Sequence, residues 1–386
     1  MKQQYDYIIT GAGCAGMSLL MRMMSDDFFL DKSILVIDAA EKNQPDRTWC
    51  FWEKQPDIFE PIVHHRWKSL DFFSPTYAGE LSIAPYEYKM IQGLQFYTYV
   101  QEAAKKHSNI EWLNAAVVSI EIDAATELAS VVLADRTIYA TKVFNSILFN
   151  EIKPAANEYL LLQHFKGWVI KTDTASFDKD RAVFMDFRVN QQYGTTFMYV
   201  LPTSANTALV EYTLFTESLL PKDEYDHALK AYISNELKLS SYTVEHEEFG
   251  IIPMTNAQLP KSTQSIVFIG IAGGQAKASS GYAFKFIQKR TAAIIDALKA
   301  GKPISLKNNF SAAKAQLYDS TLLHVLHHKK MGGAEIFAAI FKHNKAADVL
   351  SFLDNESSLF TDLKIMRSVP TGVFLPAAMA ELKLRM

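Results

Sequence analysis

A glycine-rich segment near the N-terminus carries residue types that suit the binding of a phosphate group. Glycines stand at positions 11, 13 and 16. In such a pattern the first glycine permits a tight turn, the second lets the backbone approach a pyrophosphate, and the third lets a helix pack closely on a strand. Free N–H groups at the start of that helix favour the negative charge of a phosphate. The candidate phosphate-binding residues are Gly11, Ala12, Gly13, Cys14, Ala15 and Gly16.

The segments around this loop form the unit that must position it. Tyr5–Thr10 is an apolar run typical of a strand, Met17–Met24 has the pattern of a helix, and Ser33–Ile37 is a second apolar strand. Asp38 follows that strand, where an acidic side chain accepts hydrogen bonds from the ribose of a bound nucleotide. A glycine-rich turn without a ligand is the alternative. Because strand, loop, helix, strand and acid occur in the required order, we predict dinucleotide binding.

The loop alone fits either NAD or FAD, and the rest of the chain distinguishes them. A simple NAD-dependent dehydrogenase would continue with alternating strands and helices, whereas residues 116–122, 128–133 and 137–144 read as strands of a β-meander. A second glycine-rich strand and helix follow much later, at Ile266–Gly270 and Tyr282–Ala300. This layout favours an extended FAD that is contacted at both ends.

The remaining patterns change in character along the chain. Asn43–Trp52 reads as an irregular polar and aromatic loop, and Met90–Lys106 has helical periodicity. Beyond residue 150 the pattern becomes that of an antiparallel sheet followed by helices. The elements expected there are the strands Trp168–Thr172, Ala182–Arg188, Thr195–Pro202 and Thr207–Phe215, the helix Lys222–Leu237, and helices from Ser311 onwards.

We therefore predict a mixed α/β fold with a Rossmann-like cofactor domain. Residues 1–150 together with 251–300 would form this discontinuous domain, and residues 151–250 would form an antiparallel sheet over the other end of the cofactor. Residues 301–386 would form a helical C-terminal cap.

Composition limits the classes of protein that the chain can represent. With 386 residues, of which 49% are hydrophobic and 21% charged, it is long enough for two packed domains. A net charge of −3 provides no basic surplus for nucleic acid. The two cysteines, one of them inside the glycine loop, favour a reduced, cytoplasmic protein. We expect neither a secretory signal nor a spanning helix, so membrane contact would be peripheral.

Further motifs occur in order along the chain. They are Asp46-Arg-Thr-Trp-Cys-Phe-Trp52, Gln163-His-Phe-Lys-Gly-Trp168, Phe184-Met-Asp-Phe-Arg188, Leu209-Val-Glu-Tyr-Thr213, the segment Ile269–Tyr282 and Phe352-Leu-Asp354. Together with the glycine loop they resemble the lycopene cyclases of the carotenoid pathway, which are FAD proteins of the p-hydroxybenzoate-hydroxylase fold type. The Asp-Arg-Thr-Trp segment and the Glu–aromatic–Thr strand are the specific parts of a resemblance that covers most of the chain.

The resemblance implies that lycopene and related acyclic carotenoids are the substrates. In this reaction a proton adds to an end double bond, a ring closes through a carbocation, and loss of a proton leaves a β-ionone ring. There is no net redox change, yet the resemblance implies FAD in its reduced form, with NADPH as the reductant. A reduced, anionic flavin near the polyene end would stabilise the carbocation electrostatically in a dry site.

Glu211 is the candidate proton donor. Protonating an alkene near neutral pH needs an acid with a raised pKa, and burial in an apolar pocket raises the pKa of a carboxyl group. Glu211 interrupts the apolar run Ala208–Leu214 and falls on the glutamate of the family's strand motif. That motif usually continues with a second acid, but Tyr212 follows here, so we expect Glu211 to act largely alone. The alternative is a solvent-facing strand glutamate.

The resemblance assigns other residues to the cofactor and its surroundings. Arg47 would reach the cofactor's phosphates, because a guanidinium group suits phosphate geometry, and Gly281 would let the backbone approach the isoalloxazine ring. Asp186 and Arg188 share a strand face and are expected to pair with each other. The other predicted cofactor contacts are Val118, Gly270, Ala272, Gly273 and Tyr282. The candidate aromatic walls are Trp49, Phe51, Trp52, Phe187, Tyr199 and Tyr212.

The tail raises the questions of membrane and metal binding. Residues 322–326 and 336–341 are apolar and flanked by lysines, which suits either a peripheral membrane face or helices packed into the core. His324, His327 and His328 are close in sequence, but no carboxylate or cysteine cluster accompanies them, so we predict no metal site.

One departure helps to separate the possible functions. Flavin hydroxylases of this fold carry Gly-Asp near the second cofactor strand, where the aspartate binds the ribityl chain, and Gly270-Ile-Ala-Gly-Gly274 contains no acid. Lycopene cyclases also lack this acid, so the cyclase is favoured. The alternatives are a redox flavoenzyme of the same fold, such as a hydroxylase or isoprenoid reductase, and a non-catalytic carotenoid- or lipid-binding flavoprotein.

Overall fold

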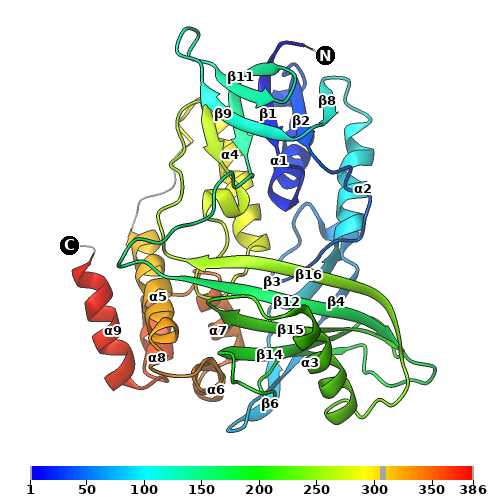
Figure 1. The fold of residues 1–386 in the computed structure, drawn as a ribbon, viewed down its shortest axis with the longest axis vertical. Coiled ribbons are helices and arrows are strands. Elements are labelled where there is room, and N and C mark those ends of the chain that lie inside the picture. The colour runs from blue at the N-terminus through cyan, green and yellow to red at the C-terminus, as the bar shows by residue number, and fades with distance from the viewer. Residues whose placement is uncertain (1, 305–309, 385–386) are drawn as a thin grey trace.

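The computed structural model describes residues 2–304 and 310–384, in which two seven-stranded sheets organise the fold (Figure 1). The first sheet has the order β8-β2-β1-β11-β10-β9, with β17 beside β11. Its strands are β1 (Gln4–Thr10), β2 (Ile34–Asp38), β8 (Ile110–Asn114), β9 (Val117–Ile122), β10 (Ala129–Leu133), β11 (Thr137–Asn145) and β17 (Ile266–Phe268). Strands β8, β2, β1 and β11 are parallel to one another, and β17 is parallel to β11. Strand β10 is antiparallel to both of its neighbours, β9 and β11. The predicted βαβ unit and β-meander are both confirmed.

One face of the first sheet is covered by α1 (Cys14–Met24), α2 (Gly93–Ala104) and α4 (Phe284–Lys299). Ile9 of β1 packs there with Leu20 of α1 and Ile294 of α4. Ile8 and Leu35 point the other way and pack under the β-meander. Because both faces are covered, β1 and β2 are continuous apolar runs and do not alternate between apolar and polar residues.

The second sheet lies below the first in Figure 1 and has the order β16-β12-β15-β14-β13-β5-β6. Its strands are β5 (Ser69–Phe73), β6 (Ala78–Ser82), β12 (Leu160–Lys171), β13 (Arg181–Asp186), β14 (Thr195–Pro202), β15 (Thr207–Thr216) and β16 (Thr243–Thr255). Helix α3 (Lys222–Asn235) covers one face, where Tyr225 and Leu229 meet Trp168 and Val210. The opposite face points toward the C-terminal helices and a small third sheet.

The structure corrects three expectations about residues 40–110. Strands β5 and β6, which we assigned to the cofactor domain, extend the second sheet beside β13. The predicted loop Asn43–Trp52 ends in strand β3 (Thr48–Glu53), and the predicted helix from Met90 begins only after strand β7 (Glu87–Gln92). Strands β3 and β7 pair with each other, and β4 (His65–Trp67) completes this third sheet. Pairing between strands distant in sequence overrides the local helical periodicity there.

The described part of the C-terminal region is helical, as predicted. Its helices are α5 (Phe310–His327), α6 (Gly333–His343), α7 (Ala346–Leu353), α8 (Leu359–Met366) and α9 (Thr371–Lys383). Leu323, Val325, Ile336, Phe337 and Phe341 are buried, so the apolar residues of segments 322–326 and 336–341 mainly pack into the core. Among the described residues, no helix is both long enough and apolar enough to cross a membrane.

Candidate active site

The loop between β1 and α1 is shaped for an anionic ligand. Gly11 has a φ of +89°, and a Cβ at Gly16 would lie 2.0 Å from the Gly11 carbonyl oxygen, so these two positions require glycine. Gly13 precedes α1 without a side-chain cap, and an added Cβ there would meet nothing within 4 Å. The N-terminus of α1 is therefore uncapped and open, which is the arrangement that phosphate binding needs.

A first hollow adjoins this loop at the carboxyl ends of β1 and β2. It is lined by Ala12, Asp38 and Lys42, and by Trp112 and Asn114 of β8. The Ala12 N–H donates to Asp38 Oδ2 at 2.6 Å, and Lys42 Nζ lies 3.6 Å from Asp38 Oδ1. The carboxylate thus stands beside the loop, where the ribose of a bound dinucleotide is held in this type of fold.

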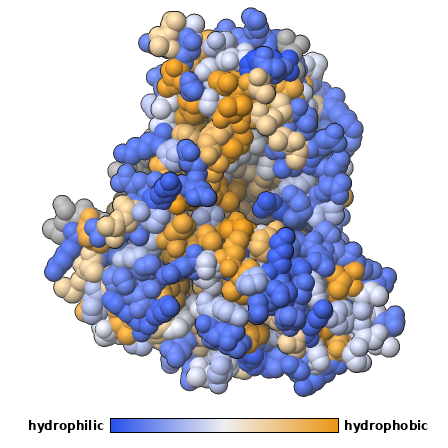
Figure 2. All heavy atoms as spheres, viewed as in Figure 1, coloured by the Kyte–Doolittle hydropathy of each residue, from blue (hydrophilic) through white to orange (hydrophobic). Residues whose placement is uncertain are grey.

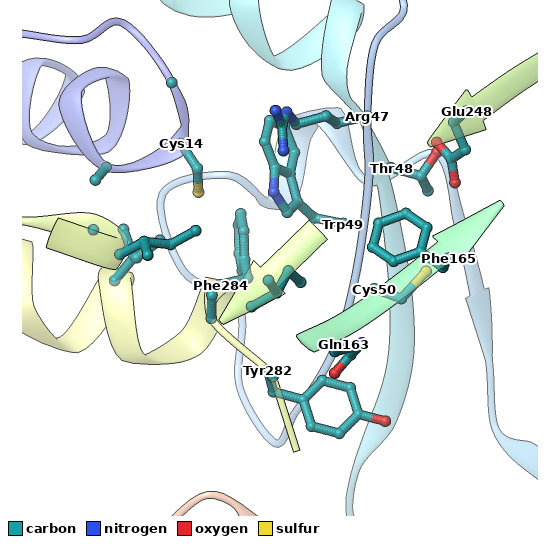
Figure 3. Close-up of a pocket in the computed structure, with 18 of the residues that line it drawn as sticks. Cys14, Arg47, Thr48, Trp49, Cys50, Gln163, Phe165, Glu248, Tyr282 and Phe284 are labelled. Carbon is teal, nitrogen blue, oxygen red and sulfur yellow. The ribbon is translucent and has the colours of Figure 1, made fainter. Parts of the chain in front are cut away.

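A cavity of about 320 Å³ runs from the loop to the second sheet (Figure 3). Gly13 and Cys14 line the end beside the loop, Glu211 and Glu248 line the other, and Figure 3 shows Arg47 between Cys14 and Glu248. This volume is within the range of small-molecule sites, roughly 300–1,000 Å³. Figure 2 shows apolar side chains gathered at the junction of the upper and lower halves of the molecule, the same level at which β16 crosses Figure 1.

The structure brings most of the predicted cofactor residues together. The predicted residues that line the cavity are Gly13, Cys14, Ala15, Arg47, Gly270, Gly281 and Tyr282. Ala272 and Gly273 lie in a short 3₁₀ turn (Gly270–Gly273), where a Cβ at Gly273 would meet the Phe268 carbonyl at 2.4 Å, so they shape the turn. Val118 is not brought to the site, because it is 59% exposed on β9 and lines neither hollow.

The residues present fit an extended FAD. Lys42 lines both hollows, so one ligand can pass from Asp38 to the cavity. The Arg47 side chain is 53% exposed, and its only ion pair in the described structure is a 3.6 Å contact with Asp46. Gln163 Oε1 is buried without a hydrogen-bond partner directly over Gly281, so a ligand N–H near Gly281 would satisfy it.

Glu211 lies on β15 at the end of the cavity that is distant from the glycine loop. Its exposed surface borders the cavity, and the Thr213 hydroxyl donates to Glu211 Oε1 at 3.0 Å. Burial raises the pKa of Glu211 well above its ordinary value, and repulsion from Glu248 adds to the effect. The Glu211 carboxyl group therefore keeps its proton to higher pH than a solvent-facing strand glutamate would.

Glu248 of β16 is a site residue that the sequence analysis missed. It is 5% exposed, and its pKa is raised by burial, while a hydrogen bond with Thr48 and the charge of Arg47 oppose the rise. The acidic stretch 245–248 reads as solvent-facing, but the alternation of Glu248, Gly250, Ile252 and Met254 on one face is a signal of a strand with a buried face. Glu211 therefore has a second carboxyl group beside it, which the expectation that it acts largely alone did not include.

A β-bulge near this pair adjusts the register of β16. Trp168 and Val169 of β12 pair with Glu247 and His246, but the next β12 residue, Ile170, pairs with Val244. Residue 245 is thus an extra residue in β16. The bulge at residue 245 precedes Glu248 along β16.

Aromatic side chains surround Glu211. The Tyr199 and Tyr282 hydroxyls are 3.0 Å apart, and Tyr282 packs edge-on against Trp52 with ring centroids 4.7 Å apart. Of the predicted walls, Trp49 and Tyr199 line the cavity, whereas Tyr212 lies on the opposite face of the sheet against α3. The lining aromatic residues that the sequence analysis missed are Tyr88, Tyr97, Phe165 and Phe284.

Two other side-chain groups are structural. Arg188 Nη2 lies 2.7 Å from Asp186 Oδ2, which confirms the expected pair. His324 Nδ1 is hydrogen-bonded to the Tyr159 hydroxyl at 2.8 Å and lies 3.0 Å from Glu381 Oε1, so it ties α5 to the residue that precedes β12 and to α9. The described residues contain no group of side chains that could hold a metal ion.

Known proteins resemble this chain both in sequence and in fold. A lycopene beta-cyclase of Pantoea ananas is 24% identical over 292 residues, covering 73% of this chain and 72% of that protein. A lycopene beta cyclase of Synechococcus elongatus is 22% identical over 314 residues, covering 77% and 72%.

Two solved structures resemble the whole fold. A geranylgeranyl bacteriochlorophyll reductase-like protein of Thermoplasma acidophilum has a TM-score of 0.61 at 12% identity and covers 100% of both chains. A flavin-dependent brominase has a TM-score of 0.61 at 13% identity and covers 99% of this chain and 98% of that chain. These likenesses confirm the predicted mixed α/β fold of the p-hydroxybenzoate-hydroxylase type, with its helical C-terminal region.

The family relationship follows from a match over nearly the whole length. Residues 6–379 match the family model described as lycopene cyclase protein. That range contains the glycine loop, the Arg47 segment and both cavity glutamates. The chain therefore belongs to the lycopene cyclase family.

Proposed function

We propose that the protein is a lycopene β-cyclase, which converts the acyclic ends of lycopene and related carotenoids into β-ionone rings without net redox change. The observation that carries this proposal is the position of Glu211 in the same cavity as the glycine loop. A carboxyl group with a raised pKa stays protonated near neutral pH and can donate to an alkene. The family match supports the class of substrate.

Glu211 is the proton donor in this proposal. The O–H bond of its carboxyl group breaks as a C–H bond forms on the end double bond of the substrate. The next double bond then attacks the resulting cation and closes the ring, and loss of a proton from the ring restores a double bond. The aromatic residues that line the cavity, among them Tyr88, Phe165 and Tyr199, would exclude water and offer electron-rich rings near a cation.

The cofactor in this proposal is FAD, reduced by NADPH. In its reduced form it supplies negative charge that stabilises the carbocation in a site of low dielectric constant. Gly13 and the N-terminus of α1, together with Arg47, would bind its phosphates, and Asp38 would bind its ribose. Gly281, with a φ of +70°, would allow the backbone to approach the flavin ring.

Anaerobic incubation of the FAD-containing protein with lycopene and NADPH tests the reaction. We expect a cyclic product of unchanged mass, without NADPH consumption in proportion to product, measured by chromatography, mass spectrometry and absorbance. Dithionite should replace NADPH. A product heavier by oxygen or hydrogen would instead support a redox flavoenzyme, and unaltered lycopene that binds tightly would support a carrier function.

We also propose that helices α8 and α9 contact a membrane surface, because a water-insoluble substrate must be taken from lipid. Figure 1 places both helices at one flank of the molecule. Their exposed apolar residues are Leu359, Phe360, Leu363, Leu375, Met379 and Leu382. Exposed Lys364, Arg367 and Lys383 lie among them, and this combination suits an anionic lipid surface.

Replacing Phe360 and Leu363 together with serine should weaken sedimentation with phosphatidylglycerol-containing vesicles by roughly tenfold or more, because burial of each side chain contributes about 1.5–3 kcal/mol when complete. These side chains are 81% and 55% exposed, so the folded state should be unaffected. Serine at Phe28 and Leu30, which are 38% and 57% exposed near the end of α1, is the matched control. Equal binding of the two double variants would contradict the assignment of this face.

A further inference from the structure

The architecture of the second sheet explains why two carboxyl groups meet in the cavity. Strand β12 runs between β15 and β16, and its Gly167 is directly opposite both Glu211 and Glu248. Residues opposite one another in a sheet point to the same face, so both side chains lie on the cavity side of Gly167. Their Cα atoms are about 10 Å apart, two strand spacings, which two glutamate side chains can bridge.

Gly167 leaves the space in which the two side chains meet. A Cβ at this position would lie 2.9 Å from Leu209 Cδ1, 3.1 Å from Glu248 Cγ and 3.4 Å from Glu248 Oε1. Any larger residue would therefore intrude on Glu248. The pair thus depends on a glycine in the middle of a central strand, where glycine is otherwise unfavourable.

The two carboxyl groups have different surroundings. Glu248 receives a hydrogen bond from Thr48 and lies near Arg47, both of which favour its ionised form. Glu211 lies among aromatic residues, with Thr213 as its hydroxyl donor. The hydrogen bond between the two carboxyl groups raises the pKa of Glu211 and lowers that of Glu248. This is the pattern of a protonated Glu211 that donates to an ionised Glu248.

Other groups near the pair leave this assignment in place. The other titratable groups that face it are Asp46, Arg47, Cys50, Tyr88, Tyr199 and Tyr282. Burial raises the pKa of Cys50 and of the three tyrosines, so these four side chains stay neutral while the carboxyl pair titrates. Glu248 Oε1 is buried and has no hydrogen-bond partner, so it is free to accept a proton.

We propose that Glu248 is the proton partner of Glu211, and that the two carboxyl groups hold one shared proton between turnovers. This assignment rests on the proposed cyclase function. Glu211 belongs to the family motif on β15, whereas Glu248 lies on a different strand, β16.

The shared proton balances the reaction. Glu211 gives its proton to the end double bond, which leaves two carboxylates beside a cation that offsets their repulsion. When the ring loses its proton, the electron pair of the broken C–H bond forms the ring double bond, and the proton bonds to a carboxylate oxygen of the pair. One O–H bond is lost and one is regained, so the pair returns to its singly protonated state without a proton from bulk water.

The pH dependence of turnover tests the partner role in the FAD-containing protein. Wild type should lose activity at low pH, where Glu248 gains a proton, and at high pH, where Glu211 loses its own. In Glu248→Gln the low-pH loss should disappear. The high-pH loss should move to lower pH by about one unit or more, because the charge that raises the pKa of Glu211 is gone.

An infrared titration of the carboxylic C=O stretch provides a readout without lycopene. We expect a protonated-carboxyl band in wild type that is absent from Glu211→Gln and titrates at lower pH in Glu248→Gln. Glu247→Gln is the matched control, because Glu247 is adjacent on β16 but 54% exposed and paired with Lys166. It should keep the wild-type band and both limbs of the pH profile.

Two results would overturn the partner role. One is a Glu248→Gln protein with the wild-type pH profile and infrared titration. If that variant does not fold, Glu248→Asp can be tested instead, because it keeps the negative charge on a shorter side chain. The partner role predicts that Glu248→Asp keeps the low-pH loss of activity, so absence of that loss is the second result. A product of altered mass would refute the cyclase function separately, because the infrared titration of the pair does not depend on the reaction.

Discussion

Glu211→Gln should reduce lycopene cyclisation by about 100-fold or more while FAD remains bound. A positioned general acid contributes typically 10²–10⁴-fold, and glutamine has nearly the shape of glutamic acid but no acidic proton. Glu211 lines the end of the cavity distant from Gly13, and glutamine keeps the size of the side chain, so the phosphate contacts should not change. Product formation under anaerobic conditions and flavin absorbance of the purified protein measure the two effects.

The same substitution also has a stability signature. Folding raises the pKa of Glu211, so the folded state binds more protons than the unfolded state above pH 4.3, the approximate ordinary value for glutamate. Stability from this group is therefore lost as pH rises from that value through the folded pKa. Glu211→Gln should flatten this decline, measured as the thermal midpoint across pH, whereas Glu247→Gln should not. Retained cyclisation in Glu211→Gln would remove Glu211 from the role of acid.

Gly13→Val should abolish FAD binding in a chain that still folds. The backbone at Gly13 has φ −82° and ψ −164°, which valine can adopt, and an added Cβ would meet nothing within 4 Å. The side chain would instead occupy the open space beside the N-terminus of α1. Loss of two charge-assisted hydrogen bonds, at about 1.5–3 kcal/mol each, corresponds to at least roughly 100-fold weaker binding.

Flavin fluorescence titration of the apoprotein measures this loss, with circular dichroism to check the fold. Gly332→Val is the matched control, because Gly332 also precedes a helix, has φ −72° and ψ 144°, and has no atom within 4 Å of an added Cβ. It is exposed and lies outside the cavity. Normal FAD affinity in Gly13→Val would place the phosphates elsewhere.

The parts of the fold that sequence analysis predicted are those whose signals are local. The βαβ unit has apolar strands buried on both faces, and each glycine of its loop has a separate steric role. The sequence therefore predicts its elements to within a few residues. The strands of the β-meander alternate in side-chain polarity and are separated by short turns. Glu211 was identified because a single acid interrupts an apolar strand.

The parts that were missed depend on partners distant in sequence. Strand β7 has a helical pattern but pairs with β3, about forty residues earlier in the chain. Glu248 belongs to an acidic stretch that is typical of a surface. Only the pairing of Gly167 with both Glu211 and Glu248 identifies it as a cavity residue. Val118 is exposed on β9, and no local property of that strand argues for a cofactor contact there.

The bulge in β16 has a consequence for how relatives of this chain can vary in length. A shift of one residue in a regular strand would turn Glu248 to the α3 side of the sheet and bring a neighbour into the cavity. Residue 245 is already one extra residue in β16, and it precedes residues 246–255, which pair with β12 in regular register. Insertions and deletions before the bulge can therefore accumulate without moving Glu248, whereas a single deletion after it would exchange the cavity acid for a surface residue.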